Sequence, residues 1–333
     1  CDETAVALIE DTGSGQPQLL SSVISTQIPL HRMYGGVIPE LASRNHSANL
    51  PAVLREALEK AGRDIHQVDV FASTAGPGLV AALLVGNTAA KALALAARKP
   101  FVAVNHLEGH MLSPFITHPE GLVPHLSLVV SGGHSLLIDV KGPGDYTLMG
   151  RSRDDAAGEC YDKAARAMGM PYPGGAALDK AAQRGDETKY SLPLPKPGAN
   201  PYDMSFSGLK TATLNLIHHA EQVGEELDTD SLCAAFCATV SNTLVPRVLQ
   251  ALKETGRRKI AVAGGVAANS RIRRDILKAA EELGAQVFMP PLSLCGDNAA
   301  MIGAQAYYEF QAGNVADMSL NAYATKSILG ETL

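Results

Sequence analysis

Residues 125–140, HLSLVVSGGHSLLIDV, place two apolar segments on either side of a glycine pair. Short apolar runs bounded by turn residues predict buried β-strands, here over 125–131 and 135–140. Gly132 and Gly133 lack Cβ atoms, so their backbone N–H groups can approach a phosphate or a carboxylate closely. A glycine pair is also a common hairpin turn, and taken alone this stretch supports both interpretations equally.

A second glycine pair follows another predicted strand, residues 259–263. Residues 261–269 read AVAGGVAAN, and a helix is predicted over 269–283. The N-terminus of a helix offers unpaired N–H groups and the positive end of a dipole to an anion. Asn269 is a suitable cap for this helix, and its amide could equally contact a ribose or a phosphate. Two glycine turns in matching places are better evidence for a nucleotide site than either one alone.

The order of predicted elements repeats along the chain. Each half predicts three strands, a helix, a strand and a helix, with insertions, which indicates a duplicated α/β fold of two domains with a central cleft for a ligand. We expect an N-terminal domain over 1–125 that lacks its first strand. A C-terminal domain with a helical insertion is expected over 126–300, and the last helix and tail, 301–333, should pack back on the N-terminal domain.

Two histidines four residues apart follow a short apolar strand, in the segment NHLEGH at 105–110. Residues four apart lie on one face of a helix, so His106 and His110 can reach a single metal ion. Asp297, in the segment CGDN at a predicted loop-to-helix junction, is the best third ligand. We favour this metal site over a pair of core imidazoles, and its ligands suit iron, zinc or manganese.

A zinc peptidase is the obvious alternative for paired histidines. That chemistry needs a glutamate directly after the first histidine, where this chain has Leu107. The acid is Glu108, which at about 100° per residue points roughly opposite the two imidazoles. The peptidase interpretation is therefore disfavoured.

Acidic residues cluster at the start of a predicted helix over 155–168. Asp162 lies seven residues after Asp155 on the same face, and a carboxylate there would suit a ribose hydroxyl or an amino group. Compensation of the helix dipole and capping are the structural alternatives.

Bulk composition limits the class of protein. Of 333 residues, 46% are hydrophobic and 19% charged, which is typical of a globular protein, and the net charge of -6 argues against an indiscriminate nucleic-acid binder. We find no apolar run that we expect to span a membrane. The five cysteines are scattered, which favours a reducing cytoplasm over a disulfide framework, and Cys233 and Cys237 are expected to be buried core thiols.

These motifs, in this order, resemble those of the Kae/Qri/Gcp family, in its bacterial TsaD branch, from Cys1 to about Asn314. The matching segments are 1–4 (CDET), 34–40 (YGGVIPE), 75–79 (AGPGL), 106–110 (HLEGH), 130–134 (VSGGH), 154–159 (DDAAGE), 172–175 (YPGG), 205–210 (SFSGLK), 263–266 (AGGV) and 295–298 (CGDN). The resemblance implies an actin/Hsp70-like ATPase (ASKHA) fold. It also implies transfer of a threonylcarbamoyl group from threonylcarbamoyl-AMP to N6 of adenosine 37 in tRNAs that read codons beginning with A, with release of AMP.

The resemblance also implies roles for individual residues. His106, His110 and Asp297 would hold one divalent metal, usually assigned as iron in this family. Asp2 and Glu3 match acids regarded as important for activity. The residues that would hold threonylcarbamoyl-AMP, or an ATP- or AMP-type nucleotide, are Val129, Val130, Ser131, Gly132, Gly133, Asp162, Gly175, Asp179 and Asn269.

Partners follow from the same resemblance. We expect a tRNA substrate, a TsaB-like paralogue and a TsaE-like ATPase in the cytoplasm, and no membrane. One departure from the family is that the apolar strand and Glu-Thr/Ser-Ser turn normally found before the 1–4 motif are absent. Two further alternatives are a non-catalytic scaffold, which would not need the metal ligands, and a sugar kinase or simple ATPase, which would not explain the histidine pair.

Overall fold

The computed structural model describes residues 2–118, 121–195 and 198–325, and Cys1 of the CDET motif lies outside these ranges. The chain divides into two units. Unit 1 comprises Cys1–Val123, Gly142–Tyr146 and Gly296–Leu333, and unit 2 comprises Pro124–Lys141 and Thr147–Cys295. Each unit is described by itself.

Unit 2 is built on a five-stranded sheet of order β7-β6-β5-β8-β9. Its strands are β5 (His125–Val130), β6 (Ser135–Gly142), β7 (Asp145–Arg151), β8 (Lys259–Ala263) and β9 (Gln286–Phe288). The central strand β5 pairs antiparallel with β6 and parallel with β8. Every residue of β5 is buried, which explains why its sequence is a nearly continuous apolar run instead of an alternating one.

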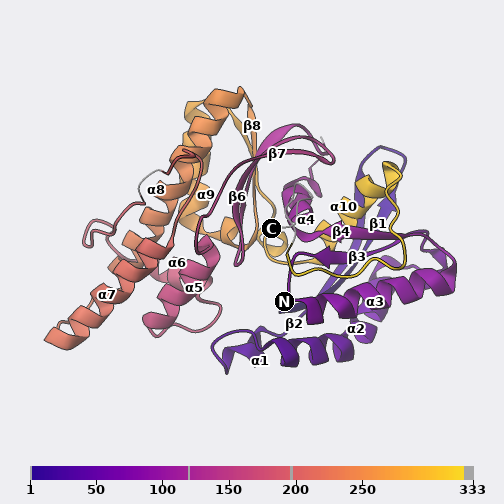
Figure 1. The fold of residues 1–333 in the computed structure, drawn as a ribbon, viewed down its shortest axis with the longest axis horizontal. Coiled ribbons are helices and arrows are strands. Elements are labelled where there is room, and N and C mark those ends of the chain that lie inside the picture. The colour runs from indigo at the N-terminus through magenta and orange to yellow at the C-terminus, as the bar shows by residue number, and fades with distance from the viewer. Residues whose placement is uncertain (1, 119–120, 196–197, 326–333) are drawn as a thin grey trace. The chain divides into compact units, whose positions relative to one another are not determined.

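Helices surround this sheet in unit 2 (Figure 1). They are α5 (Ala157–Ala167), α6 (Gly174–Ala182), α7 (Ser207–Val223), α8 (Thr229–Thr255) and α9 (Ser270–Glu282). The long helix α8 packs against both α6 and α9, and α5 packs against α6 and α7. Large side chains such as Tyr161, Phe206 and Phe236 fill one core with the apolar residues of β5 and β8.

Unit 1 contains two strand pairs with helices on either side (Figure 1). The strands are β1 (Glu3–Asp11), β2 (Pro17–Thr26), β3 (Phe71–Gly76) and β4 (Phe101–Asn105). The helices are α1 (Ile28–Arg32), α2 (Pro39–Ala61), α3 (Val80–Ala97), α4 (His106–Leu112) and α10 (Ala299–Gln311). Helix α10 packs on all four strands and on α4, α2 packs on β1 and β2, and α3 packs on β3.

The two units share a pattern of strands. In unit 2, β5 joins the pair β6 and β7 to the parallel pair β8 and β9. Unit 1 has an antiparallel pair, β1 and β2, and a parallel pair, β3 and β4, but within the described ranges no strand joins them. The duplication read from the sequence is therefore visible in the order of elements, without the joining strand in unit 1.

Local departures from the predicted elements have physical causes. Strand β2 ends at Thr26, and the short helix α1 begins at Ile28 with Pro29 in its first turn, a position that proline readily occupies. Helix α6 was not predicted, because its glycine-rich start looked like a turn only. The structure also contains short 3-10 helices that the sequence does not predict: η1 (Ile65–Gln67), η2 (Ser113–Phe115), η3 (Gly265–Ala268) and η4 (Leu292–Leu294).

Two helices, α3 and α8, are long and apolar enough to cross a membrane by length and composition alone, which the sequence reading did not anticipate. Most of α8 is buried within unit 2, as expected of a core helix. Core helices of globular proteins meet the same criteria, so this observation is weak evidence for a membrane.

The ends of β5 and β8 approach so closely that one glycine is required. Gly264 has a φ of +91°, and a Cβ there would lie 2.3 Å from the backbone oxygen of Val130. Adjacent Gly265 has open space around its own Cβ position.

We expect Gly264→Ala to lower the free energy of unfolding by about 2 kcal/mol or more, because it combines a strained backbone with a backbone clash. Urea denaturation would measure this change, with Gly265→Ala as the matched control. Equal midpoints for the two variants would contradict the close approach of β5 and β8.

Candidate metal centre and glycine turns

Helix α4 presents the two histidines. It begins directly after β4, and Asn105 caps it by accepting a hydrogen bond from the Leu107 backbone N–H at 2.9 Å. His110 is fully buried, whereas the side chain of His106 keeps 20% of its surface exposed. The i, i+4 spacing therefore produces a pair of imidazoles on one helical face, as the sequence predicts, with ring centroids 4.7 Å apart.

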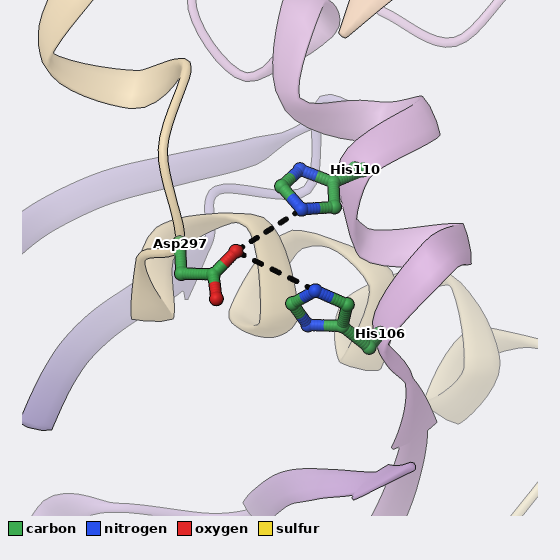
Figure 2. Close-up of side chains that lie close together, drawn as sticks. All are labelled: His106, His110 and Asp297. Atoms are coloured by element: carbon green, nitrogen blue, oxygen red, sulfur yellow. Dashed lines mark hydrogen bonds and ion pairs between the residues drawn. The ribbon is translucent and has the colours of Figure 1, made fainter. Parts of the chain in front are cut away.

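Asp297 reaches this pair from the start of α10 (Figure 2). Its Oδ1 lies 3.2 Å from Nε2 of His110 and 3.5 Å from Nε2 of His106. The following residue, Asn298, caps α10 by accepting from the Met301 N–H at 2.9 Å and donates to the Gly296 oxygen at 2.9 Å. These two bonds fix the turn that carries Asp297.

The ligand atoms of His106, His110 and Asp297 all lie within 4.8 Å of one another, and together they could hold a metal ion. Ligands about 2.1 Å from an ion stand about 3.0–3.4 Å apart at octahedral to tetrahedral angles. The Nε2-to-Oδ1 separation lies within this range for His110, at 3.2 Å, and just above it for His106, at 3.5 Å. The donor set of two imidazoles and a carboxylate suits a divalent transition metal. The residues therefore fit the predicted ion, and the structure brings all three predicted ligands together.

Close packing of α4 on α10 maintains this geometry. A Cβ at Gly109 would lie 3.0 Å from Cδ1 of Ile302 and 3.3 Å from Cγ of Met301. The glycine between the histidines thus lets the two helices approach. Ser113 adds a hydrogen bond from its hydroxyl to the His110 oxygen at 2.9 Å.

Charge is unevenly distributed around the triad. Burial acts to raise the pKa of Asp297, but the charge of His106 and the hydrogen bond with His110 outweigh it, so that this pKa lies well below its usual range. Burial raises the pKa of Glu3 to about 7, and the charges of Asp2 and Asp297 add to the rise. The predicted acid Glu3 is therefore electrostatically coupled to the triad, and Asp2 lies beside it.

Glu108 faces away from the histidines, as expected. Its carboxylate accepts a hydrogen bond from Nε2 of Gln305 on α10 at 2.7 Å. This engagement disfavours the peptidase alternative, which needs a glutamate beside the ion.

The first glycine turn, in unit 2, is a hairpin between β5 and β6. Val130 pairs with Ser135, and the turn is closed by the Ser131 N–H donating to the His134 oxygen at 2.8 Å. Val129 and Val130 are buried in the strand, whereas Gly132 and Gly133 are exposed at the tip of the turn. The glycine pair therefore forms a hairpin turn, which was one of the two interpretations of this stretch. A turn of this geometry is compatible with phosphate binding as well.

Helix α5 starts against this turn. The Gly158 N–H donates to the Ser131 oxygen at 3.1 Å, and a Cβ at Gly158 would lie 2.6 Å from that oxygen. Further along α5, Asp162 accepts from the Gly174 N–H at 2.8 Å, next to Gly175 at the start of α6. The glycine turn and the starts of α5 and α6, three segments that carry predicted nucleotide residues, thus pack together within unit 2 through Gly158 and Gly174.

Asn269 and Asp179 already have protein partners. Asn269 caps α9, accepting from the Ile272 N–H at 3.1 Å, and its Nδ2 lies 3.6 Å from Sγ of buried Cys237. Asp179 accepts from the N–H and the hydroxyl of Ser270. The two side chains therefore support the start of α9, and their predicted contacts with a ligand remain predictions.

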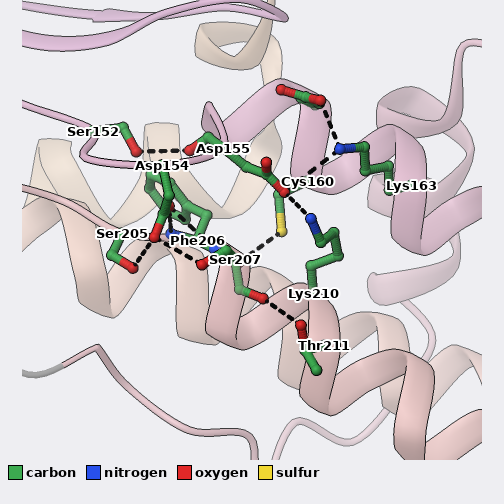
Figure 3. A network of polar contacts seen from close by, with 11 residues as sticks. Ser152, Asp154, Asp155, Cys160, Lys163, Ser205, Phe206, Ser207, Lys210 and Thr211 are labelled. Carbon is green, nitrogen blue, oxygen red and sulfur yellow. Dashed lines mark hydrogen bonds and ion pairs between the residues drawn. The ribbon is translucent and has the colours of Figure 1, made fainter.

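A polar network joins the starts of α5 and α7 (Figure 3). Asp154 accepts hydrogen bonds from the Ser205 hydroxyl at 2.5 Å, the Phe206 N–H at 2.7 Å and the Ser207 hydroxyl at 2.8 Å. Asp155 pairs with Lys210, and Lys163 lies 3.6 Å from the same carboxylate. The segments 154–159 and 205–210 therefore bind each other, with Asp155 paired to Lys210.

The basic run on α9 is engaged internally. Arg271 pairs with Glu187 and Asp275, and Arg274 pairs with Asp275. Arg273 donates to backbone oxygens, including that of Ala267 at 3.1 Å. Arg271 and Arg273 are therefore engaged within unit 2, whereas the side chain of Arg274 remains 66% exposed.

Sequence reasoning missed a buried polar cluster in unit 1. Nδ1 of His46 lies 2.8 Å from the Thr4 hydroxyl and 3.1 Å from Nε2 of Gln27. The Gln27 N–H donates to the Asp2 oxygen at 2.6 Å. Fully buried His31 accepts from the Ile38 N–H at 3.4 Å. The only signal in the sequence was the pair His31 and His46 in an amphipathic region. Such a pair does not show whether the histidines belong to the core or to a functional site.

Comparisons with known proteins agree with this geometry. A family model described as TsaD, tRNA N6-adenosine threonylcarbamoyltransferase, matches residues 18–304. A protein of Caldicellulosiruptor bescii named tRNA N6-adenosine threonylcarbamoyltransferase is 48% identical over 322 residues, which cover 97% of this chain and 94% of that protein.

Solved structures support the fold alone. Component A of (R)-2-hydroxyglutaryl-CoA dehydratase from Acidaminococcus fermentans aligns with a TM-score of 0.52 at 14% identity, covering 93% of this chain and 95% of that one. Full-length HypF in a phosphate- and nucleotide-bound form aligns with a TM-score of 0.57 at 15% identity, covering 80% of this chain and 42% of that one. Both neighbours are ATPases of the ASKHA type, which confirms the predicted actin/Hsp70-like fold.

Removal of a ligand should abolish metal binding. We expect anaerobically purified protein to carry about one ion per chain, and His110→Ala or Asp297→Ala to weaken binding by more than about 100-fold, because each removes a direct ligand. Elemental analysis with a chelator titration would measure this loss. Glu108→Gln, on the same helix but bonded to Gln305, is the control, and a similar loss in that variant would refute the assignment.

Asp154 should stabilise unit 2 in a pH-dependent way. Burial acts to raise the pKa of Asp154, but its hydrogen bonds outweigh this effect and hold the pKa below its usual range. The stabilisation is therefore present above the unfolded pKa of about 4 and is lost as pH falls through the lower folded value.

We expect Asp154→Ala to cost about 2 kcal/mol at pH 7, with a difference from wild type that shrinks below about pH 4. Urea unfolding across pH would test this, with Glu226→Ala as a control for loss of an exposed negative charge. A difference that grows on acidification would show that the sign is wrong.

Proposed function

Since this chain belongs to the TsaD family of tRNA N6-adenosine threonylcarbamoyltransferases, we propose that it transfers the threonylcarbamoyl group of threonylcarbamoyl-AMP to N6 of adenosine 37. The substrates are tRNAs that read codons beginning with A, and AMP is released. Family membership establishes a transferase that modifies tRNA, and the geometry of the triad is the observation that supports this particular reaction.

His106, His110 and Asp297 would hold one divalent ion, with iron the first candidate and zinc or manganese the alternatives. When bound, such an ion supplies Lewis acidity toward carbonyl or carboxylate oxygens. The chain's own contribution is a fixed position: Asn105 and Asn298 cap the helices that carry the ligands, and Gly109 lets those helices approach.

Unit 2 would hold the adenylate. The turn formed by the exposed residues Gly132 and Gly133 suits a phosphate and would stabilise the negative charge that remains on departing AMP. Asp162, next to Gly174 and Gly175, would accept from a ribose hydroxyl with its remaining lone pairs. The solved HypF form that contains phosphate and nucleotide shows that a protein of this fold type binds such ligands.

The acids at the start of β1 would act on the reacting amine. The adenine N6 amine is a poor nucleophile, so positioning supplies much of the rate. A carboxyl whose pKa lies near 7 exchanges a proton readily at neutral pH, and Glu3 has this property. We therefore place Glu3, with Asp2 beside it, at the reacting end of the RNA substrate.

An apolar stripe on α3 supports the expected protein partners. Leu95 is 71% exposed, and Val80, Ala81, Leu84 and Ala92 are exposed on the same helix. Four-residue spacing places Val80, Leu84, Thr88 and Ala92 along one face, and exposed apolar stripes commonly mark protein interfaces. We propose that a TsaB-like paralogue covers this stripe and that a TsaE-like ATPase joins the complex, in the cytoplasm, where the tRNA substrate is.

A reconstituted transfer assay tests the proposal. With threonylcarbamoyl-AMP, a matching tRNA and the partner proteins, wild type should form threonylcarbamoyladenosine. Asp297→Ala should lose more than about 100-fold in rate, because the ion and one fixed ligand are removed together. Mass spectrometry of the digested tRNA would quantify the product.

Two controls make this assay decisive. Glu108→Gln should retain wild-type activity, which the peptidase alternative does not allow. The absence of modified adenosine with intact, metal-loaded wild type would refute the transferase assignment for this chain.

A further inference from the structure

We propose that the loop between α1 and α2, residues 32–38, is a stacking platform for an unpaired base of the tRNA anticodon loop, with Tyr34 as the platform. This inference rests on the proposed function. We call residues 32–38 the crest loop. Met33 is 72% exposed and Tyr34 58% exposed, and they follow exposed Arg32.

The crest loop has a fixed backbone although its side chains are exposed. The N–H groups of Tyr34 and Gly36 both donate to the His31 oxygen, at 3.0 and 3.3 Å. The Ile38 N–H donates to Nδ1 of His31, which is itself fully buried. Buried His31 thus holds the loop through its backbone oxygen at one end and its imidazole at the other, and Tyr34 can stack on a partner without the cost of ordering the backbone.

The same loop is rooted beside the acids of the candidate site. Gln27, at the start of α1, donates its N–H to the Asp2 oxygen at 2.6 Å, and its side chain contacts His46. Asp2 precedes Glu3, whose charge is coupled to Asp297. Helix α1, which leads into the crest loop, therefore begins in unit 1 beside the first residues of β1 and the proposed reacting acids.

The chemistry of the loop favours RNA. Unpaired bases in RNA loops are recognised by stacking on aromatic rings and on arginine planes, which Tyr34 and Arg32 supply in adjacent positions. A stable protein interface needs about 800 Å² on each partner, whereas one stacked base needs only a ring and its flank. The α3 stripe is the longer apolar surface and suits a protein, and the basic run on α9 is already paired internally.

Substitution of the aromatic ring tests this inference. In the complex with its partner proteins, we expect Tyr34→Ala to raise the Kd and KM for tRNA about tenfold with little change in kcat. Tyr34→Phe should behave as wild type because stacking needs only the ring. A tRNA with 2-aminopurine next to the target adenosine should lose fluorescence on binding to wild type and to Tyr34→Phe, but not to Tyr34→Ala.

Matched measurements separate the possible failures. Val223→Ala, at an apolar residue at the end of α7 with the same exposed fraction as Tyr34 (58%), should leave tRNA affinity and 2-aminopurine quenching unchanged. If wild type transfers the group but Tyr34→Ala binds tRNA normally, the platform is refuted while the proposed function stands. Loss of partner association in Tyr34→Ala, without a change in quenching, would identify a protein-docking loop and would also refute the platform. Failure of wild type to transfer would refute the proposed function instead.

Discussion

One carboxylate between two imidazoles is the constraint on which unit 1 depends. Asp297 and His110 are 187 residues apart in sequence, yet their ligand atoms lie 3.2 Å apart. This contact requires α10 to pack against α4 at close range, which Gly109 permits. Because the charge of His106 and the hydrogen bond with His110 help Asp297 to keep its charge, the same contact links the packing of α10 on α4 to the capacity of unit 1 for a cation.

The parts that could be predicted from sequence have local patterns. The i, i+4 histidines, the apolar run of β5 and the glycine turn before η3 each carry their own periodicity or turn chemistry, and each is found in the structure. Asp297 could be paired with the histidines because few other acids stand at a loop-to-helix junction. Local rules therefore identified the residue types of the site, and the fold brought them together.

Other features depend on partners distant in sequence and could not be predicted. The sequence around Asp179 would be the same whether its carboxylate bound a ribose or Ser270. Only the fold, which brings α6 to the start of α9, shows the bond to Ser270. The arginines of α9 resemble an RNA surface until Glu187 and Asp275 are placed beside them. Tyr34 belongs to the motif at 34–40, to which the sequence assigned no role. That its ring is exposed could be seen only in the fold.

The distribution of polar contacts suits the proposed reaction, in which a rigid protein would position a poor nucleophile, the adenine N6 amine. In both units, side chains that resemble ligands, such as Asn269 and Gln27, are already bound to neighbouring backbone or side chains. Exposed residues at the proposed sites include Gly132 and Gly133 on the glycine turn and Tyr34 on the crest loop. Groups of this kind lose little entropy on binding, so most of their interaction energy would remain for orienting the adenylate and the RNA base that we propose as ligands. A chemical step limited by alignment would benefit most from such rigid contacts.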